Sequence, residues 1–458
     1  MNVSLPFTRT KHGKRFTTQP IAKQFNQLTD RAGFGCLFLV CFLKSEILFR
    51  PNPMEKINED IWVEILKFCP MRDQFSLIQL NENVKSYVKY HWGHLKSVTL
   101  STGDLELLDK NEELMQEFLG SWSRTVQWLT LNRCSMDLLK KWTQFSFPHL
   151  RSLDCHMEYN LEEADEETLL LTVLFPHLTT LTLNSSTSGR HLWRWKQLKE
   201  LNLIWCEYLD TDYFEEIFDR LKLTKLTLLY YGYNVILGDK VMAITRCTTL
   251  EELTIDDHHL LGGALQRLID LPHFRRLSFY TRDYNEFLAN SVAKHKPLKV
   301  RSLLFNDSFW SSERVTDDIL KMTNLQRLVL QEDDIDTQQL HDICQKLPHL
   351  EELHLLQMRE LPTSTRLWNT IGTCPSLRLL NLSSTKLGNW MDLSKSHLPK
   401  VLLNRTFPLT LHLHNTGFDP QKVIPALEHD NLKISFEPIH LNVWSSRFME
   451  IEFNPELK

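Results

Sequence analysis

Two matching apolar phrases within residues 325–358 constrain the fold of this chain more than any other feature. The stretch reads LQRLVLQEDDIDTQQLHDICQKLPHLEELHLLQM. Leucines occupy positions 1, 4 and 6 of both phrases, which begin at Leu325 and Leu350. Alternation within each phrase is typical of a strand, and the apolar residues from Ile335 to Leu347 recur at helical spacing. Because one strand and one helix cannot bury both apolar faces alone, neighbouring copies must stack as a solenoid.

The phrase L-x-x-L-x-L recurs along most of the chain at a mean interval of about 26 residues, the spacing of leucine-rich repeats. The phrases begin at Leu95, Val126, Leu150, Leu178, Leu198, Leu223, Leu250, Phe274, Val300, Leu325, Leu350 and Leu377. Cys134 and Cys206 fall at position 9, where this repeat places Asn or Cys to bond the backbone. We therefore predict an α/β leucine-rich-repeat solenoid over residues 93–400, with a curved parallel sheet and convex helices.

The L-x-x-L-x-L pattern weakens after Leu382, and insertions lengthen some of its intervals in the first half of the array. Residues 401–458 are predicted as irregular final repeats and a C-terminal cap, with strands at Val401/Leu403, Leu411/Leu413 and Ile434/Phe436. The segment from Leu161 to Phe175 (LEEADEETLLLTVLF) is predicted as a convex helix with an acid-rich first turn. We expect its acidic run to be a solvated face.

Residues 54–92 form a small unit of another kind. Asn58 is placed to cap a first helix that Pro70 ends, Asp73 to cap a second, and a third runs from Val84 to Trp92. About forty residues bury too little surface to be comfortably stable alone. This helical unit therefore needs a partner, either the adjoining repeats or another protein.

The run INEDIWVEILKFCPMRDQFSLIQL resembles an F-box, with Ile57 for the usual leucine and Pro70 and Asp73 matching the later signature. Val315-Thr316-Asp317 and Cys374-Pro375-Ser376-Leu377 resemble the cysteine-containing repeats found behind F-boxes. The resemblance implies the substrate receptor of an SCF-type cullin–RING ubiquitin ligase, which binds the ligase adaptor through its helices and a target protein through its repeats. The implied adaptor-docking candidates are Ile57, Ile61, Ile65, Leu66, Pro70 and Phe75. Some of the six must instead form the module's own core, and the sequence does not separate the two groups. The alternative is a leucine-rich-repeat scaffold or inhibitor whose first helices are only a cap.

The first 53 residues are basic, with eight Lys and Arg against Asp30 and Glu46. Their apolar run FGCLFLVCFL is about half as long as a bilayer span requires. We interpret residues 1–53 as a disordered or gene-model extension, with Met54 as the start of the native chain. A mitochondrial transit peptide is the alternative.

Charge and cysteine usage exclude several classes of function. Without residues 1–53 the chain has 44 basic and 55 acidic residues, a poor balance for binding nucleic acid. Nine scattered cysteines without a CxxC pair favour a reducing compartment, cytoplasmic or nuclear. We find no catalytic motif, no metal-ligand set and no cysteine whose basic neighbourhood would make it a convincing nucleophile. We therefore expect a non-enzymatic protein without cofactor or membrane segment.

What remains is a protein-binding surface on the concave face. Positions 1, 4 and 6 of the repeat fill the core, so positions 3, 5, 7 and 8 face the concave side. Aromatic residues and arginine are the types that anchor interfaces. The substrate-binding candidates on this basis are Trp128, Trp205, Tyr230, Asp256, Asp257, Arg276, Tyr280 and Glu332.

Overall fold

The structure, a computed structural model, describes residues 59–157, 162–230, 238–256, 258–280, 285–306, 313–387, 399–403, 405–440 and 448–457. The chain divides into two compact units, Met1–Glu158 (unit 1) and Tyr159–Lys458 (unit 2). Unit 1 contains the helical module, residues 59–92, and the first repeats. The predicted extension, Ile57, Asn58 and Asp257 lie outside the described residues.

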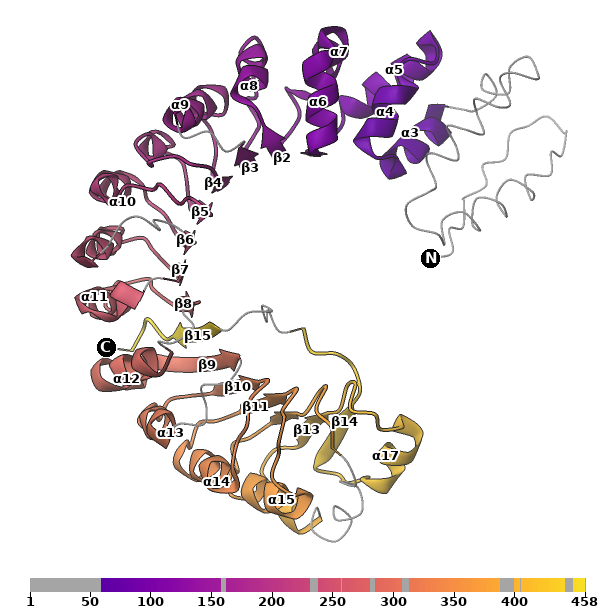
Figure 1. The fold of residues 1–458 in the computed structure, drawn as a ribbon. Coiled ribbons are helices and arrows are strands. Elements are labelled where there is room, and N and C mark those ends of the chain that lie inside the picture. Colours follow the sequence, from indigo (N-terminus) through magenta and orange to yellow (C-terminus); the bar gives the residue numbers. More distant parts are fainter. Residues whose placement is uncertain are drawn as a thin grey trace, which may run out of the picture. The chain divides into compact units, whose positions relative to one another are not determined.

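Unit 1 carries parallel strands whose residues align by repeat position. The strands are β1 (Ser97–Leu100), β2 (Trp128–Cys134) and β3 (Ser152–Met157). Ser97 lies opposite Trp128, which lies opposite Ser152, and all three are position 3 of their phrases. The helices are α3 (Glu59–Phe68), α4 (Met71–Leu77), α5 (Glu82–Trp92), α6 (Thr102–Lys110), α7 (Glu112–Trp122) and α8 (Met136–Trp142) (Figure 1).

Unit 2 contains a second run of strands in the same register. They are β4 (Thr180–Asn184), β5 (Glu200–Ile204), β6 (Lys225–Leu229), β7 (Glu252–Ile255), β8 (Arg276–Phe279), β9 (Val300–Asn306), β10 (Arg327–Gln331), β11 (Glu352–Leu356), β12 (Leu379–Asn381), β13 (Leu409–His412), β14 (Leu432–Ser435) and β15 (Phe448–Phe453). Lys225 lies opposite Glu252, which lies opposite Arg276, again at position 3. All pairs among β4–β8 and among β9–β14 are parallel.

Each of the twelve predicted phrases forms a strand, and this confirms the α/β leucine-rich-repeat fold. The apolar positions 1, 4 and 6 fill the core, as Leu325, Leu328 and Leu330 show by being fully buried. Burial stabilises the fold by about 25 cal/mol per Å² of apolar surface removed from water. Because every copy repeats the same three positions, the core continues from one repeat to the next.

The helices of unit 2 lie on the outer side of its curved sheet (Figure 1). They are α9 (Ala164–Leu174), η2 (Leu192–Arg194), η3 (Thr211–Tyr213), α10 (Phe214–Arg220), η4 (Gly238–Arg246), η5 (His258–Leu261), α11 (Gly263–Ile269), α12 (Asn285–His295), η6 (Pro297–Lys299), α13 (Glu313–Leu320), α14 (Thr337–Lys346), α15 (Ser364–Gly372) and α17 (Pro420–Ala426). Helix α14 confirms the helix predicted between the two matching phrases. It begins with a capping box, in which the Asp336 side chain accepts from the Gln339 N–H and the Gln339 side chain accepts from the Asp336 N–H.

The acidic run on α9 is only in part the solvated face that we predicted. The Asp165 carboxylate accepts hydrogen bonds from Thr187 Oγ1 at 2.9 Å, from the Ser188 N–H at 2.9 Å and from Ser188 Oγ at 2.7 Å. Glu167 is buried. The first turn of the helix therefore holds the loop that follows β4, which periodicity alone did not indicate.

A left-handed residue follows many of the strands at position 8 of the repeat. Positive φ occurs at Arg133, Trp205, Tyr230, Glu332, Gln357, Ser384 and Asn415. This conformation turns the N–H toward the next copy, so that Trp205 donates to the Leu229 carbonyl at 3.0 Å. At position 9 the Cys206 thiol donates to the Leu183 carbonyl at 3.4 Å, which confirms the predicted role of that cysteine.

The C-terminal strand β15 lies in the middle of the unit 2 sheet. It pairs antiparallel with β8 on one side and with β9 on the other (Figure 1). Ile451 lies opposite both Leu277 and Leu303. The prediction that the tail caps the end of the array is therefore wrong for residues 448–453, because these residues complete the sheet between two repeats that do not pair with each other.

Two local predictions also need correction. Helix α4 begins at Met71 after Pro70, so Asp73 lies inside its first turn instead of capping it, and no side chain caps that end. Residues 399–402 are helical, so the strand predicted at Val401/Leu403 does not form.

Candidate protein-interaction surfaces

The outer face of α3 in the helical module is apolar and exposed. Ile61 is 53% exposed and Phe68 is 74% exposed, while Ile65 between them is half-buried. Steps of four and then three residues place these side chains on one face of the helix. Pro70, two residues after the helix, is also exposed. A partner can reach this surface, which we call the α3 face: Ile61, Ile65, Phe68 and Pro70.

Leu66 and Phe75, also predicted to dock the adaptor, lie instead in the core of unit 1. Both side chains are buried. The Phe75 ring packs edge-on against Trp92 at 5.8 Å and against Phe118 at 5.1 Å between ring centres. Leu66 points to the opposite side of α3 from Ile61, together with buried Trp62. The two residues stabilise the module from within, which corrects this part of the site prediction.

A buried glutamine closes the turn between α3 and α4. Gln74 Nε2 donates to the carbonyls of Leu66 at 3.1 Å and Cys69 at 2.8 Å. Its Oε1 accepts from Trp92 Nε1 at 2.7 Å. The last carbonyls of α3 are thus satisfied by a side chain that α5 also binds. This network holds α3 in one orientation and so presents the α3 face rigidly.

Phe68 is a candidate that the sequence reasoning left out of the docking set. Its spacing from Ile61 did place it on an apolar face of α3. However, Trp62 and Leu66 make the other side of the helix apolar as well, so the pattern could not separate the outer face from the inner one. Only the packing of α3 against α5 shows which side remains exposed.

Ion pairs join the helical module to the first repeat. Glu117 on α7 pairs with Lys85 at 2.5 Å and with Lys89 at 3.1 Å, both on α5. Burial favours the neutral form of Glu117, but the hydrogen bonds from the two lysines outweigh it and lower the pKa of this carboxyl. The polar contact lies beside the aromatic core, so the module is anchored on its inner side.

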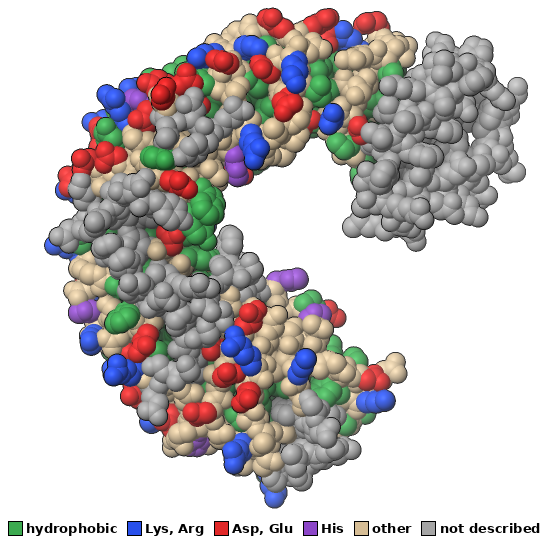
Figure 2. Space-filling view, viewed as in Figure 1, with side chains coloured by type: hydrophobic (Ala, Val, Ile, Leu, Met, Phe, Trp, Pro, Cys, Tyr) green, Lys and Arg blue, Asp and Glu red, His purple; other side chains and the backbone are tan. Residues whose placement is uncertain are grey.

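On the concave side of unit 2 the structure brings together three of the predicted substrate-binding residues. The Trp205 and Tyr230 rings stack almost parallel, 4.2 Å apart between centres at an angle of 11°. They are 47% and 39% exposed. The Asp256 carboxylate accepts from the Tyr230 N–H at 2.7 Å. In Figure 2 hydrophobic side chains gather beside β5 and β6. We call Trp205 and Tyr230 the aromatic stack.

Arg276 and Tyr280 are predicted concave residues that β15 partly covers. Arg276 pairs with Glu452 at 2.7 Å, and the Tyr280 ring stacks on Phe448 at 5.2 Å. Burial, together with the nearby Glu450 and Tyr230, raises the pKa of Tyr280. Both side chains therefore contribute to holding the C-terminal strand, and this corrects their assignment as residues open to a substrate.

The other described concave candidates, Trp128 and Glu332, belong to other repeats than the aromatic stack. Trp128 is exposed at the start of β2 in unit 1. Glu332 is exposed after β10, beyond β15, where its N–H donates to the Leu356 carbonyl. In the part of unit 2 that the structure describes, Glu332 has no ring contact or ion pair with the stack. The group that the structure brings together is therefore Trp205, Tyr230 and Asp256.

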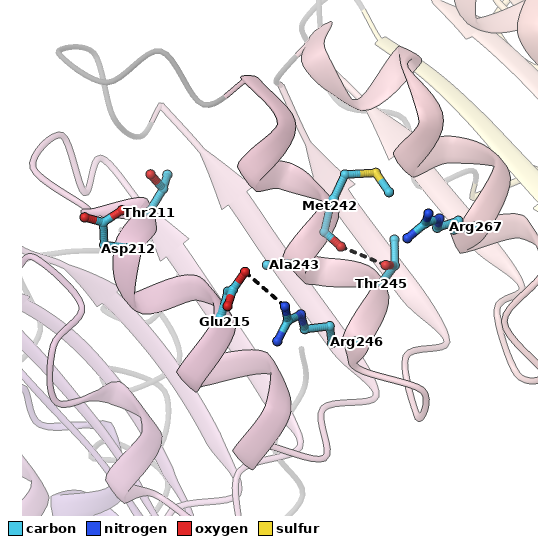
Figure 3. A pocket seen from close by; sticks show the side chains of 8 residues that line it. All are labelled: Thr211, Asp212, Glu215, Met242, Ala243, Thr245, Arg246 and Arg267. Atoms are coloured by element: carbon cyan, nitrogen blue, oxygen red, sulfur yellow. Dashed lines mark hydrogen bonds and ion pairs between the residues drawn. The ribbon is translucent and has the colours of Figure 1, made fainter.

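A shallow pocket of about 360 Å³ opens on the convex side of unit 2 between η3, α10, η4 and α11. Figure 3 shows its mostly polar lining, which is Thr211, Asp212, Glu215, Met242, Ala243, Thr245, Arg246 and Arg267. Arg246 is held by Glu215 and Asp219, each at 3.0 Å. Acidic and basic groups alternate in this space between neighbouring convex helices, and no nucleophile is placed beside a base.

The thiols of the described residues are buried. Burial raises the pKa of Cys206 to about 12. Cys374 differs, because a hydrogen bond from Cys344 lowers its pKa to about 7, and its carbonyl accepts a hydrogen bond from the buried Arg405. Arg405 is thus a basic neighbour of Cys374, but the buried sulfur cannot reach a substrate, so this residue does not contradict the prediction that no cysteine is a convincing nucleophile.

Two further features are absent from the residues that the structure describes. No cluster of three or more His, Cys, Asp or Glu side chains there is suited to a metal ion. In the same part of the chain, no helix combines the length and the apolar character that crossing a membrane requires.

Comparison with known proteins gives structural likeness only. No family model and no curated protein matches the sequence. Among solved structures, a TLR13–ssRNA13 complex aligns at 17% identity and a TM-score of 0.41, over 76% of this chain and 51% of that one. The Rad7 and Elc1 complex in yeast aligns at 17% identity with a TM-score of 0.33, over 92% of this chain and 93% of that one. LegL7 from Legionella pneumophila, a leucine-rich repeat-containing protein, aligns at 15% identity with a TM-score of 0.36, over 62% of this chain and 93% of that one. This chain thus spans about half the length of the TLR13 chain.

Proposed function

We propose that this protein is the substrate-recognition subunit of an SCF-type ubiquitin ligase. The helical module would bind the ligase adaptor, and the leucine-rich repeats would bind a target protein. The observation that carries the proposal is the α3 face, where apolar side chains remain exposed although the same helix buries Trp62 and Leu66 on its other side. The sequence of this module resembles an F-box, whose helices dock an adaptor.

Contiguous exposed apolar side chains commonly mark a surface that a partner covers. Ile61 and Phe68 lie on a helix that Gln74 and the aromatic core already hold in place. A partner could therefore bury this face without rearranging the fold, because the opposite side of α3 already holds the helix in place. Removing it from water would contribute about 25 cal/mol per Å² of apolar area to binding.

The proposed role requires no covalent chemistry from this chain. A receptor of this kind raises the effective concentration of its target near the ubiquitin-conjugating enzyme. We propose accordingly that the protein has no cofactor, that its partners are the adaptor and one or more target proteins, and that it works in the cytoplasm or the nucleus.

A specific observation favours a second candidate, a leucine-rich-repeat scaffold with no role in ubiquitin transfer. The aromatic core continues from the module into the repeats, since the Trp92 and Phe118 rings pack 4.9 Å apart and Phe118 meets Trp122 at 5.1 Å. An N-terminal cap would be built in this way. Capping and adaptor binding can coexist, because the cap uses the inner side of the module and the adaptor would use the α3 face.

The test is co-expression of the full chain with the SCF adaptor, followed by size-exclusion chromatography and native mass spectrometry. We expect a one-to-one complex, which Ile61→Asp combined with Phe68→Asp abolishes. The matched control is Val173→Asp on α9, which places the same charge at a residue that is 66% exposed. Leu66→Asp is unsuitable, because a buried charge would unfold the module. A folded chain that ignores the adaptor would support the scaffold instead.

A further inference from the structure

Two other aromatic rings in unit 2, those of Trp193 and Phe407, are covered by the chain's own arginines. The Arg220 guanidinium lies 4.1 Å from the ring centre of Trp193, and that of Arg194 lies 5.2 Å away. Arg378 covers Phe407 at 4.2 Å. A guanidinium over an aromatic face is an attractive cation–π arrangement, and tryptophan is the strongest partner. The chain thus already uses arginine to cover its surface rings.

The aromatic stack is built from the same ring types but lacks this cover. Over Trp205 and Tyr230 the part of the chain that the structure describes places no arginine or lysine. The two rings contact each other instead, and both stay substantially exposed. An electron-rich ring face is therefore left open toward the concave side.

Backbone conformation gives an independent indication. Trp205 and Tyr230 have φ of 61° and 53°, in the left-handed region. The other residues with positive φ at position 8 are polar: Arg133, Glu332, Gln357, Ser384 and Asn415. A bulky side chain is an outlier in this conformation, which glycine or asparagine adopts at lower cost. Trp205 and Tyr230 lie in successive repeats, and because both are exposed they contribute little to the core. Backbone strain of this kind is concentrated at functional sites.

The charge around the stack is acidic. Asp256 lies at its edge, held by the Tyr230 N–H. The concave strands beside it and β15 carry Glu200, Glu252, Glu450 and Glu452 against Lys225 and Arg276. Both basic residues already pair with acids, Lys225 with Glu252 at 3.3 Å and Arg276 with Glu452. Such a face attracts a cation and repels the phosphates of a nucleic acid.

We propose that the aromatic stack and Asp256 form a binding site for an arginine side chain in a segment of a target protein. The guanidinium would lie on the open face of the stack, as the chain's own arginines lie on Trp193 and Phe407, with the Asp256 charge beside it. This inference rests on the proposed function, in which the repeats capture a target, and it names the chemistry by which the target is recognised.

The experiment selects ligands without assuming a sequence. A random dodecapeptide phage library is panned on the full-length chain and, in parallel, on Trp205→Gly and Trp128→Ala. Glycine accepts the left-handed backbone, so the first variant removes the ring without adding strain. Trp128 is a matched control, since it is exposed on the concave side but stacks on no aromatic ring in the described structure. We expect arginine to be enriched on the native chain and on Trp128→Ala, and not on Trp205→Gly.

Binding of the selected peptide then tests whether recognition depends on the positive charge of its arginine. Replacing its arginine by citrulline, a neutral group of the same shape, should weaken binding about tenfold or more in fluorescence polarisation. Asp256→Asn should weaken binding of the arginine peptide and leave binding of the citrulline peptide unchanged. Recovery of no peptide, equal binding of the citrulline form, or full binding by Trp205→Gly would overturn the proposal. Single-stranded RNA that binds through Trp205 more tightly than the peptide would also overturn it.

Adaptor binding, measured on the same preparations, separates this inference from the proposed function. Trp205→Gly should still form the adaptor complex, and the double Ile61/Phe68 variant should still bind the peptide. Loss of peptide selectivity with an intact adaptor complex would reject the arginine site alone. Peptide binding without any adaptor complex would reject the ligase role and leave the site in place.

Discussion

The two halves of the unit 2 sheet, β4–β7 and β9–β12, differ at the same repeat position. Position 5 in the first half carries half-buried polar residues, which are Thr182, Asn202, Thr227 and Thr254. In the second half it carries buried residues, which are Leu304, Val329, His354 and Asn381. The strands have the same geometry in both halves. The difference lies in what covers them, and it leaves the first half as the surface open to a partner.

The C-terminal strand accounts for part of this closure. Phe448 at the start of β15 packs with Leu304 and Val329 on the concave side, with Tyr280 against the same cluster. Farther along the sheet, His354 and Asn381 form a hydrogen bond with each other, with Nδ2 of Asn381 at 3.1 Å from Nδ1 of His354. Burial lowers the pKa of His354. One repeat scaffold thus supports an open half and a closed half in which the position 5 side chains are buried.

The largest effect is expected from breaking the packing of β15. Ile451 is buried where the strand meets β8 and β9, so Ile451→Ala should lower the free energy of unfolding by about 2–5 kcal/mol, measured by urea denaturation. Ile424→Ala on α17 removes an exposed isoleucine and should change the free energy of unfolding by less than about 0.5 kcal/mol. Equal effects of the two changes would show that β15 does not hold the sheet in solution.

A reciprocal exchange at position 5 sharpens the comparison of the two halves. Val329→Thr buries a hydroxyl on the closed side and should cost about 1–3 kcal/mol. Thr254→Val on the open side keeps the shape and exposes a methyl group, so it should stay within about 0.5 kcal/mol. Thermal unfolding of both variants measures the difference. A cost for Val329→Thr as small as that for Thr254→Val would mean that the second half is also open.

A pH-dependent effect is expected at Glu450, between the two halves. Burial is the main cause that raises the pKa of this carboxyl above its usual 4.5. The folded state therefore holds the proton more tightly than the unfolded state, and this group makes stability fall as the pH rises through the interval above 4.5. Glu450→Gln should then stabilise the protein slightly at neutral pH and have no such benefit at low pH. Urea titrations at both pH values check this, and a loss of stability at neutral pH would contradict it.

The smallest change in stability is expected at the aromatic stack. Trp205→Gly removes the contacts of an exposed ring, and it also relieves the strain of a tryptophan with a left-handed backbone. Because these contributions oppose each other, the free energy of unfolding should stay within about 1 kcal/mol of that of the native protein. Differential scanning calorimetry measures it. A large loss would mean that the ring serves the fold, and the case for a binding role would weaken.

Local pattern predicted much of this fold. The leucines of phrases such as Leu325, Leu328 and Leu330 are buried because a strand in a stacked repeat always turns the same positions inward. The helix from Thr337 followed from its apolar spacing and polar cap. The concave location of Trp205, Tyr230 and Asp256 followed from the same register. These features depend on a few neighbouring residues and on the next copy of the repeat.

The candidate surfaces were predicted less completely. Leu66 was grouped with Ile61, because α3 is apolar on two sides and only its packing shows which side is buried. Phe75 lies on α4, and only its contacts with Trp92 and Phe118 show that it belongs to the core. Arg276 and Tyr280 were placed on an open face, since nothing near them in the sequence signals Glu452 and Phe448. The alternating run FMEIEF does have the period of a strand, and it was the one signal available for β15.

By itself the sequence determined the repeat register, the core positions and the helical module, because each depends on short-range periodicity in an amphipathic chain. Tertiary structure alone decided where β15 lies. Strand alternation shows that a segment can pair, but it does not say with which edge, and Arg276 and Glu452 are 176 residues apart. Pairing across that distance depends on the free edges of β8 and β9, which exist only once the repeats on both sides have folded.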